Sequence, residues 1–568
     1  MPGWRQRLLA EDRSRSPARD RGPFGFGIEL THWLRDWAWG RSPAVDLVRN
    51  AANKLAADNR ISCPVIRRLA NCKGNENNAE RIVQSIIPQD RFPHVTHLED
   101  STVDTVLLPY STFRWLQLMN PRKFRIHMGA KMGGVSDWWV QFASSEEGRS
   151  MWAVHPWLIN KTPQDLNYHI PLMMFDDSGP VSDANSSYAR CYYSLLGTGS
   201  EKETRIIMST GFKQEGIDRS WACILSSFEE MAGAIDEGKW GGVLLFFGCD
   251  LEYCCNELGM PHYNPLKPCC YCAADTMGAP HTDYSAGAMW RHTIRDNVGF
   301  LAHMRQPRHP FVDHSLFNMH TYRLDVMHLL DHHWVTSLVA GNIISIHVRD
   351  RDGILPGSTI DERLDFFNND LRAYYSFRGV RNRLPPLRQS NLMGDSGYPE
   401  LRGPLVKAAN TRSLVPFLLN FQERAVNANP AMQNRHMLKV VHSVHMLYEM
   451  IYAAAYFLTE AETKTLVLEF CTRLGMHYQI LAVQAVRDLL KLWKQTPKLH
   501  YVVGHLPTQA RLINPRFVQG YTSESMVGSM ADIYSKSMSG PHHRTVQNKF
   551  AKKYCTGLTI DWTLGAII

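Results

Sequence analysis

The chain has 568 residues, of which 44% are apolar and 20% are charged, close to the usage of ordinary globular proteins. That composition excludes wholesale disorder, and a chain of this length can bury a large core without disulfide staples. Lysine and arginine exceed the acids by eight, a mild excess that suits a polyanionic partner without requiring one.

The first 44 residues are expected to form a basic, disordered tail. Their stretch 13–21 is rich in arginine and low in complexity, which is typical of a nuclear-targeting or nucleic-acid-binding arm and also of a solvated tail. Residues 45–160 are predicted to be mostly helical, with tryptophan clusters at 138–139 and 152–157 that are expected to pack in a core.

A strand-rich block over 161–345 supplies the first part of an expected α/β core. Apolar runs and aromatic alternation predict strands there, and helical periodicity predicts helices between and after them. The predicted strands lie at 170–175, 187–196, 204–209, 242–247 and 318–325, and the predicted helices at 221–234 and 326–342.

Residues 346–495 are strongly helical by periodicity and are expected to form a helical insertion into the sheet-based core. Their longest apolar run, 446–458, contains Glu449 and is too short to cross a membrane. No membrane partner is therefore expected.

The last part of the core is expected over 496–568. It begins with a short strand or buried segment at 498–503. A helix follows over 523–538, with Thr522 or Ser523 available as its N-cap.

Two aspartates, Asp176 and Asp177, follow the first apolar strand directly. A carboxylate at the carboxyl end of a strand points out of the sheet, where ligands bind in α/β folds. The alternative is a turn in which the aspartate caps backbone amides.

Asp325 stands where a predicted strand passes into a helix, and His328 follows it by three residues. His332 lies four residues further on, with His333 beside it, so His328 and His332 could share one helical face. A carboxylate here could hold Mg²⁺ or Mn²⁺ with an imidazole to orient it, and the histidine pair would also suit zinc. The alternative is a helix N-cap aspartate beside an interfacial histidine pair.

Glu524 falls in the first turn of the late helix, where a carboxylate either joins the other acids or only complements the helix dipole. Before that helix, an arginine-rich loop suits phosphate oxygens, and a solvated loop is the alternative. Its arginines are Arg378, Arg381, Arg383, Arg388 and Arg402.

Cys269 and Cys272 form a CxxC knuckle, which predicts a structural zinc site if two more ligands join it. Buried structural cysteines are the alternative. The candidates for the missing pair, none at a diagnostic spacing, are Cys249, Cys254, Cys255, His262 and His281. The twelve cysteines otherwise form no regular framework, so reduced thiols in an intracellular compartment are expected.

Together these segments resemble the DDE transposases of eukaryotic cut-and-paste elements, nearest to the CACTA, Plavaka and Kyakuja–Dileera–Zisupton types and related transposon-derived proteins. The similarity covers about residues 100–560 and is carried by four segments. These are an Ile-Pro-Leu strand ending in aspartate, a Pro-Cys-x-x-Cys-x-Ala-Asp knuckle, the Asp-x-Met-His block at 325–328 and a late Glu-x-x-x-Gly helix. The aspartate followed by histidine at this spacing is the most specific of them, and Asp177 aligns with the first acid better than Asp176.

The resemblance implies an RNase H-like mixed sheet interrupted by a large α-helical insertion, with DNA (transposon ends and target) as partner and a nuclear location. Asp177, Asp325 and Glu524 would hold two Mg²⁺ or Mn²⁺ ions that clamp a phosphodiester for cleavage and transfer of a DNA strand. His328 would lie beside these ligands or near the scissile phosphate. A homo-oligomer would be compatible with this activity.

Two other classes stay open. The chain could be a catalytically inactive, transposon-derived DNA-binding protein whose acids are remnants, or a zinc-stabilised structural protein. Convergence of the three carboxylates on one two-metal site would favour the enzyme. The absence of GxxxxGK[ST], HExxH and GxSxG motifs argues against an ATPase, a zinc protease and an α/β hydrolase.

Overall fold

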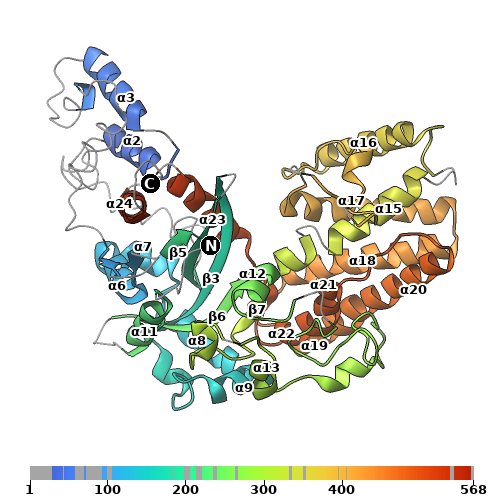
Figure 1. Ribbon diagram of the computed structural model, residues 1–568, viewed down its shortest axis with the longest axis horizontal. Helices are drawn as coiled ribbons and strands as arrows, with labels where there is room; N and C mark the ends of the chain where they lie inside the picture. Colours follow the sequence, from blue (N-terminus) through green and yellow to red (C-terminus); the bar gives the residue numbers. More distant parts are fainter. Residues whose placement is uncertain are drawn as a thin grey trace, which may run out of the picture. The chain divides into compact units, whose positions relative to one another are not determined.

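Figure 1 shows the chain as a ribbon drawn from a computed structural model. The residues that the structure describes are 28–41, 44–57, 69–71, 93–98, 105–182, 185–197, 205–212, 220–233, 239–262, 266–306, 308–331, 335–349, 354–394, 396–403, 406–535, 537 and 543–564. The basic stretch 13–21 lies outside them.

The described chain is a mixed α/β protein with one seven-stranded sheet, in the order β1-β2-β5-β4-β3-β6-β7. Its strands are β1 (Val95–His97), β2 (Thr105–Leu107), β3 (His169–Ser182), β4 (Asn185–Ser194), β5 (Ile206–Phe212), β6 (Gly241–Cys249) and β7 (Tyr322–Leu324). The predicted strands at 170–175, 187–196, 204–209 and 242–247 are confirmed as β3 to β6. The fifth is correct in place but much shorter than 318–325.

Strands β3 and β4 form a long antiparallel hairpin in which Phe175 pairs with Cys191 and Asp177 with Ala189. β4 continues antiparallel to β5. On the other side of the sheet, β6 and β7 run parallel to each other. All nine residues of β6 are buried, as expected for the continuous apolar run that parallel strands carry.

The chain divides into two compact units. The first comprises residues 1–135, 167–244 and 522–568, and the second comprises 136–166 and 245–521. The boundary between 244 and 245 falls within strand β6.

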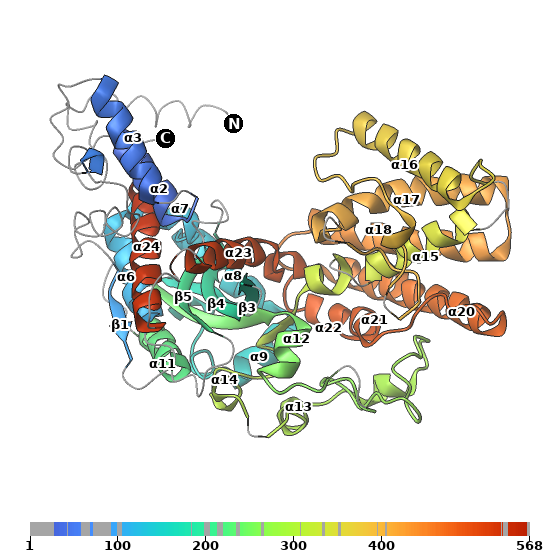
Figure 2. The ribbon, with the colours of Figure 1, turned by 45° about the horizontal axis from the view of Figure 1, so that its top comes forward.

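In the first unit, helices cover the sheet from both ends of the chain. They are α2 (Ile28–Ala38), α3 (Ala44–Ala57), α6 (Pro109–Met119), α7 (Pro121–His127), α11 (Ser220–Gly233) and α24 (His543–Leu564). Figure 2 shows α24 beside α2, with which it makes extensive contact. The hydroxyl of Tyr554 on α24 accepts a hydrogen bond of 2.8 Å from the Ile207 backbone N–H, which ties this helix to β5.

The expected disordered tail over 1–44 is wrong for residues 28–38, because these residues form α2 and its apolar face is buried.

The second unit is mainly helical. Its α-helices are α9 (Glu146–Val154), α12 (Leu251–Asn256), α13 (Asn297–Ala302), α14 (Pro310–Asp313), α15 (Val335–Arg349), α16 (Ile360–Phe377), α17 (Ala408–Ala428), α18 (Met432–Ala453), α19 (Glu460–Thr465), α20 (Arg473–Arg487), α21 (Pro497–His500) and α22 (Leu506–Ala510). Three single π-helical turns interrupt them: η6 (Met327–Asp331), η8 (Leu466–Thr472) and η9 (Tyr501–His505). Helices α8 (Met132–Ser144) and α23 (Tyr521–Ser535) each cross a boundary between the units.

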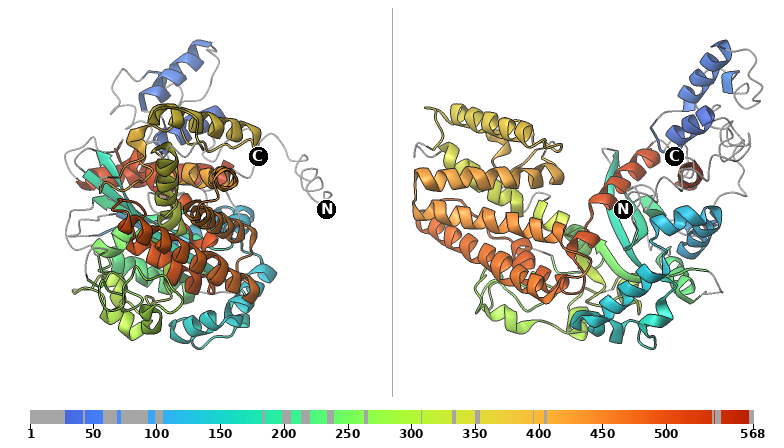
Figure 3. Two further views of the ribbon diagram at one scale, coloured as in Figure 1. Left: turned by 90° about the vertical axis from the view of Figure 1, so that its right-hand side faces the viewer. Right: turned by 180° about the vertical axis from the view of Figure 1, so that it is seen from behind.

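Helices α16 to α20 confirm the predicted helical character of 346–495. They stack side by side in Figure 3, with the yellow α16 at one end. Phe367 packs edge-to-face on Phe417 and Phe421, with ring centroids 5.3 and 5.4 Å apart, so aromatic packing joins α16 to α17. None of the described helices is long and apolar enough to cross a membrane.

The tryptophan clusters pack as expected. The ring of Trp138 stacks on Phe142 at 5.1 Å, and Trp139 meets Trp152 edge-to-face at 5.8 Å. These contacts join α8 to α9 within the second unit. The predicted strand at 498–503 is wrong, because α21 and η9 occupy that segment, although it is buried as expected.

Candidate functional site

Four buried side chains of the second unit form a cluster that could hold a metal ion such as zinc. Cys269, Cys272, His500 and His505 each offer one donor atom, and these atoms all lie within 4.8 Å of one another. Cys269 Sγ is 3.2 Å from His505 Nε2, Cys272 Sγ is 3.4 Å from His500 Nε2, and the two Nε2 atoms are 3.2 Å apart. Zinc–ligand bonds of about 2.0–2.3 Å correspond to ligand separations of roughly 3.3–3.8 Å around a tetrahedron, and these three separations are close to that range.

A π-helical turn brings the two histidines together. In an α-helix, residues five apart are rotated by roughly 140° from each other, so His500 and His505 would face different directions. The turn η9 closes i to i+5 and brings the two imidazoles edge-to-face, with ring centroids 5.0 Å apart. Gly504 is required there, because a Cβ atom would stand 2.6 Å from the ring of Trp290.

The electrostatics of the cluster favour metal ligation. Burial lowers the pKa of His500 to about 4 and of His505 to about 3, so both imidazoles are neutral at pH 7. Hydrogen bonding to Cys269 and to His500 lowers the pKa of Cys272, whereas burial raises that of Cys269. Neutral imidazoles and a thiolate are the forms that bind zinc.

Arg295, which is not one of the four ligands, holds the backbone of the CxxC knuckle. Arg295 donates hydrogen bonds of 3.1 Å from Nη1 to the carbonyls of Cys269 and Cys270. A guanidinium that gathers several carbonyls fixes the loop that carries both thiols. The CxxC prediction is therefore confirmed as half of a possible Cys2His2 metal site, and the expected partners Cys249, Cys254, Cys255, His262 and His281 do not belong to it.

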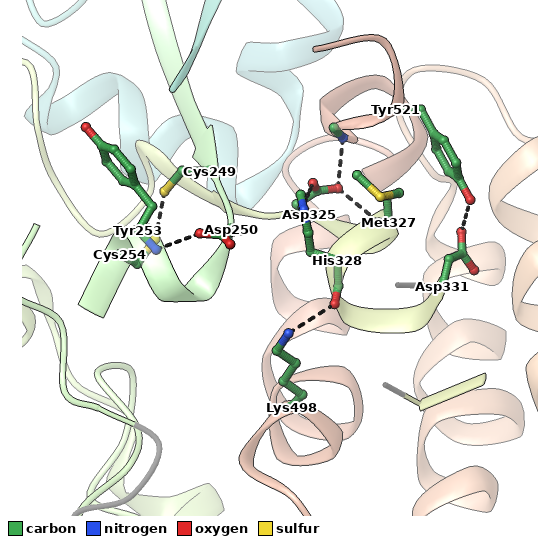
Figure 4. Close-up of polar contacts among 11 residues, drawn as sticks. Cys249, Asp250, Tyr253, Cys254, Asp325, Met327, His328, Asp331, Lys498 and Tyr521 are labelled. Atoms are coloured by element: carbon green, nitrogen blue, oxygen red, sulfur yellow. Dashed lines mark hydrogen bonds and ion pairs between the residues drawn. The ribbon is translucent and has the colours of Figure 1, made fainter. Parts of the chain in front are cut away.

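Two carboxylates emerge together from the parallel strands of the second unit. Cys249 pairs with Leu324 as the last pair of β6 and β7, and the next residues are Asp250 and Asp325. Adjacent strands lie about 4.8 Å apart, so these two aspartates leave the sheet at one level and at one edge. Ligands bind at such carboxyl edges in α/β folds. Figure 4 shows both side chains at this edge.

The two carboxylates are engaged to different extents. Both oxygens of Asp325 accept hydrogen bonds: Oδ1 from the backbone N–H groups of Met327 (2.9 Å) and Gly520 (2.8 Å), and Oδ2 contacts His328 Nδ1 at 2.6 Å. Asp250 uses Oδ1 to cap α12 through the Tyr253 N–H at 2.6 Å. Asp325 thus ties the end of β7 to the residue that precedes α23.

A half-buried lysine accompanies these acids. Lys498 on α21 donates from Nζ to the carbonyl oxygen of His328 at 3.4 Å (Figure 4). Burial lowers the pKa of Lys498 to about 7, and the carboxylates of Asp250 and Asp325 act in the opposite direction. A cation close to both acids offsets their mutual repulsion.

A third acid, Asp331, closes the turn that follows. Burial raises its pKa to about 7, although Tyr448 and Tyr521 both donate hydrogen bonds to it, the latter at 2.5 Å. The guanidinium of Arg412 lies 4.7 Å from the Tyr521 ring. The predicted helix 326–342 is thus split into the turn η6 and α15, and His332 and His333 lie outside the described residues.

In the first unit, Asp176 and Asp177 lie within β3 and not beyond its end. Both are buried, and neighbouring strand residues point to opposite faces. Asp176 Oδ2 pairs with Arg190 Nε at 2.6 Å, and the Arg190 guanidinium stacks 4.2 Å from the Trp221 ring. Asp176 therefore has a structural ion pair within the first unit.

Glu524 lies in the first turn of α23, as predicted, and its side chain is outside the described residues. Its neighbour Ser523 is buried. Burial raises the pKa of Cys191 to about 12, and the groups close enough to perturb it include Asp177 and a hydrogen-bonded Ser523. The first turn of α23 and the β3 acid therefore share a neighbour on β4.

Two features escaped the sequence analysis. Asp250 directly follows an apolar strand, the same signal that singled out Asp177 and Asp325. His500 and His505 carried no recognised spacing, because only a π-turn makes an i, i+5 pair converge. No protein-family profile matches the chain, and no curated protein matches it at a significant level.

Proposed function

We propose that the chain is a divalent-metal-dependent enzyme that cleaves and joins DNA strands in the manner of a DDE transposase. The observation that carries the proposal is the pair Asp250 and Asp325, one position beyond the last residue pair of two parallel strands. Two carboxylates at one sheet edge supply the oxygen ligands that Mg²⁺ and Mn²⁺ prefer.

The sheet order supports an RNase H-like core for this enzyme. Three antiparallel strands, β5-β4-β3, are followed on the far side of β3 by β6 and β7, which are parallel to each other. The helices of 346–495 come between β7 and α23, where the resemblance implies an insertion. The ends of β6 and β7 would then supply the acids Asp250 and Asp325 of the second unit.

At this edge of the second unit Asp250 is the proposed direct ligand. Asp325 stays in the site in a positioning role, because three hydrogen bonds already engage both of its oxygens. With His328 it holds the residue before α23, and thereby the helix that carries Glu524. Bound by such carboxylates, two Mg²⁺ or Mn²⁺ ions would activate a water or 3′-hydroxyl nucleophile and stabilise the leaving oxygen.

The charge balance supports the same conclusion. Several carboxylates at one edge repel one another unless a cation lies among them. Protonated Lys498 provides a positive charge beside Asp250 and Asp325, and these carboxylates favour its charged form. Transposon ends and target DNA are the proposed substrates, and nuclear location and self-association follow from that proposal.

The test is cleavage of duplex DNA by the purified full chain with Mn²⁺. Asp250→Asn should reduce nicking at least 100-fold, while thermal stability stays unchanged, because asparagine caps a helix as well as aspartate does. Glu257→Gln, a carboxyl-to-amide change just beyond the same short helix, should leave cleavage intact.

Full activity of a folded Asp250→Asn protein would remove Asp250 from the ligand set. DNA binding without cleavage by the wild-type chain would instead favour the inactive DNA-binding protein. Asp325→Asn should lower both stability and cleavage, since it disturbs three hydrogen bonds as well as the site.

A further inference from the structure

A solvent-open cavity of about 550 Å³ lies in the helical part of the second unit, between α16, the loop that follows it and the start of α17. Small-molecule and cofactor pockets span roughly 300–1,000 Å³, so this volume can hold a ligand. The described residues that line it are Asn368, Leu371, Arg372, Tyr375, Arg383, Leu384, Pro385, Pro386, Lys407 and Asn410.

The rim of the cavity is cationic. Arg372, Arg383 and Lys407 are exposed, and none of the described lining residues is acidic. Arg372 donates to the Asn369 side chain at 3.4 Å and Arg383 to the Val380 carbonyl at 2.8 Å. Within the described part of the chain these three cations pair with no carboxylate, so their charge is available to an anion.

The floor of the cavity is apolar. Leu371, Tyr375 and Leu384 are buried, and Pro385 and Pro386 complete the wall. A phosphate alone would use the rim and leave this floor unoccupied. A ligand with a flat apolar part and a phosphate would use both.

The walls are fixed before any ligand binds. The Asn368 side chain accepts from the Leu387 N–H at 2.8 Å and donates to the Leu387 carbonyl at 2.9 Å, which fastens the loop to α16. On the other side, the Ser413 hydroxyl of α17 donates to the carbonyl of Asn382, which fastens the loop to α17. A preformed pocket loses less free energy in ordering when it binds.

We propose that this cavity binds an unpaired nucleotide of a DNA strand. The base would lie on the floor formed by Leu371, Tyr375 and Leu384, and the flanking phosphates would contact Arg372, Arg383 and Lys407. Bases stack on such surfaces only when they are unpaired, whereas a duplex would reach the rim alone. The choice of DNA rests on the proposed function, while the binding itself needs neither Asp250 and Asp325 nor a divalent metal.

The test is fluorescence anisotropy of the full chain with labelled oligonucleotides, without added divalent metal. The pocket variant, Arg372→Gln with Arg383→Gln and Lys407→Gln, should bind single-stranded DNA at least tenfold more weakly. In a plot of log affinity against log salt concentration, the slope for this variant should be shallower by about two. Each of the three lost phosphate contacts contributes about 0.7 on a single strand. A strand with an abasic site at each second position should also bind the wild type more weakly.

The matched control is Arg378→Gln with Arg381→Gln and Arg388→Gln. It also removes three positive charges, from exposed residues that follow α16 and do not line the cavity. The control should lose less than threefold in affinity. An equal loss in both variants would overturn the proposal in favour of diffuse loop charge.

Three further results would also overturn it. These are unchanged strand affinity in the pocket variant, equal weakening of duplex and single-strand binding, and a pocket that takes free thymidine monophosphate but no strand. Failure of the proposed function looks different, because absent cleavage with intact, pocket-dependent strand binding leaves this site standing.

Discussion

One methyl group added at Gly520 would disturb Asp325. With Asp250, this aspartate forms the pair of carboxylates at the ends of β6 and β7, here called the acidic edge. The Gly520 backbone N–H donates to Asp325 Oδ1 at 2.8 Å, and a Cβ atom at this position would stand 2.2 Å from Asp325 Oδ2. Real Cβ atoms essentially never come closer than 3.0 Å, so the carboxylate or the backbone must move by about 0.8 Å. The Asp325 carboxylate is held by its other bonds, so Gly520→Ala should break the contact.

The expected cost follows from two effects. Loss of a hydrogen bond to a charged group costs about 1.5–3 kcal/mol, and overpacking a buried position costs about 1–3 kcal/mol. Gly520→Ala should therefore lower the free energy of unfolding by roughly 3–5 kcal/mol, measured from urea midpoints and slopes. Gly528→Ala is the matched control, because an added Cβ on α23 there meets nothing within 4 Å and should be neutral or slightly stabilising.

A double-mutant cycle isolates the contact. In the Asp325→Ala background the clashing oxygen is gone, so Gly520→Ala should cost less than about 1 kcal/mol and the coupling should exceed about 2 kcal/mol. Additive losses in the double variant would refute the contact. A Gly520→Ala protein as stable as the wild type would refute the sterics as well.

Three other predictions concern separate parts of the molecule. Cys269→Ser should abolish bound zinc, measured by elemental analysis, and lower the melting temperature, whereas His281→Gln, outside the cluster, should change neither. Burial raises the pKa of Asp331 to about 7, so the folded state keeps a proton that the unfolded state releases near pH 4. The contribution of this carboxyl to the free energy of unfolding is greatest below about pH 4 and falls by a few kcal/mol as the pH rises to 7. Asp331→Asn should therefore flatten that part of a plot of urea midpoint against pH. Asp176→Asn should cost about 3 kcal/mol in urea unfolding, because it leaves the charge of Arg190 buried without its partner.

Strands that are local and apolar were predictable. The runs at 170–175 and 242–247 are buried along their length, and a continuous run of apolar residues predicts a buried strand. The three-residue β7 gave a weak signal, because its pairing with β6 depends on a distant partner. Helix α2 was missed since its apolar face packs on α24, more than 500 residues further along the chain.

The metal cluster shows a sharper limit. Cys269 and Cys272 were visible because their spacing is a local property of one knuckle. His500 and His505 lie more than 220 residues away and converge only through a π-turn, which no periodicity template contains. Asp250 was within reach of the same strand-end rule that found Asp325, so its omission reflects incomplete use of that rule.

The short helix α21 and the turn η9 connect the metal cluster with the acidic edge. Four residues of helix cannot hold a fixed position alone, because isolated helices of this length are unstable in water. His500 anchors this segment at the cluster, while Lys498, two residues earlier, reaches the carbonyl of His328 beside Asp325. The ligand cluster therefore helps to place half-buried Lys498 beside these acids. A metal bound at Cys269, Cys272, His500 and His505 would in this way also fix the position of Lys498, a charge beside Asp250 and Asp325 that it does not contact.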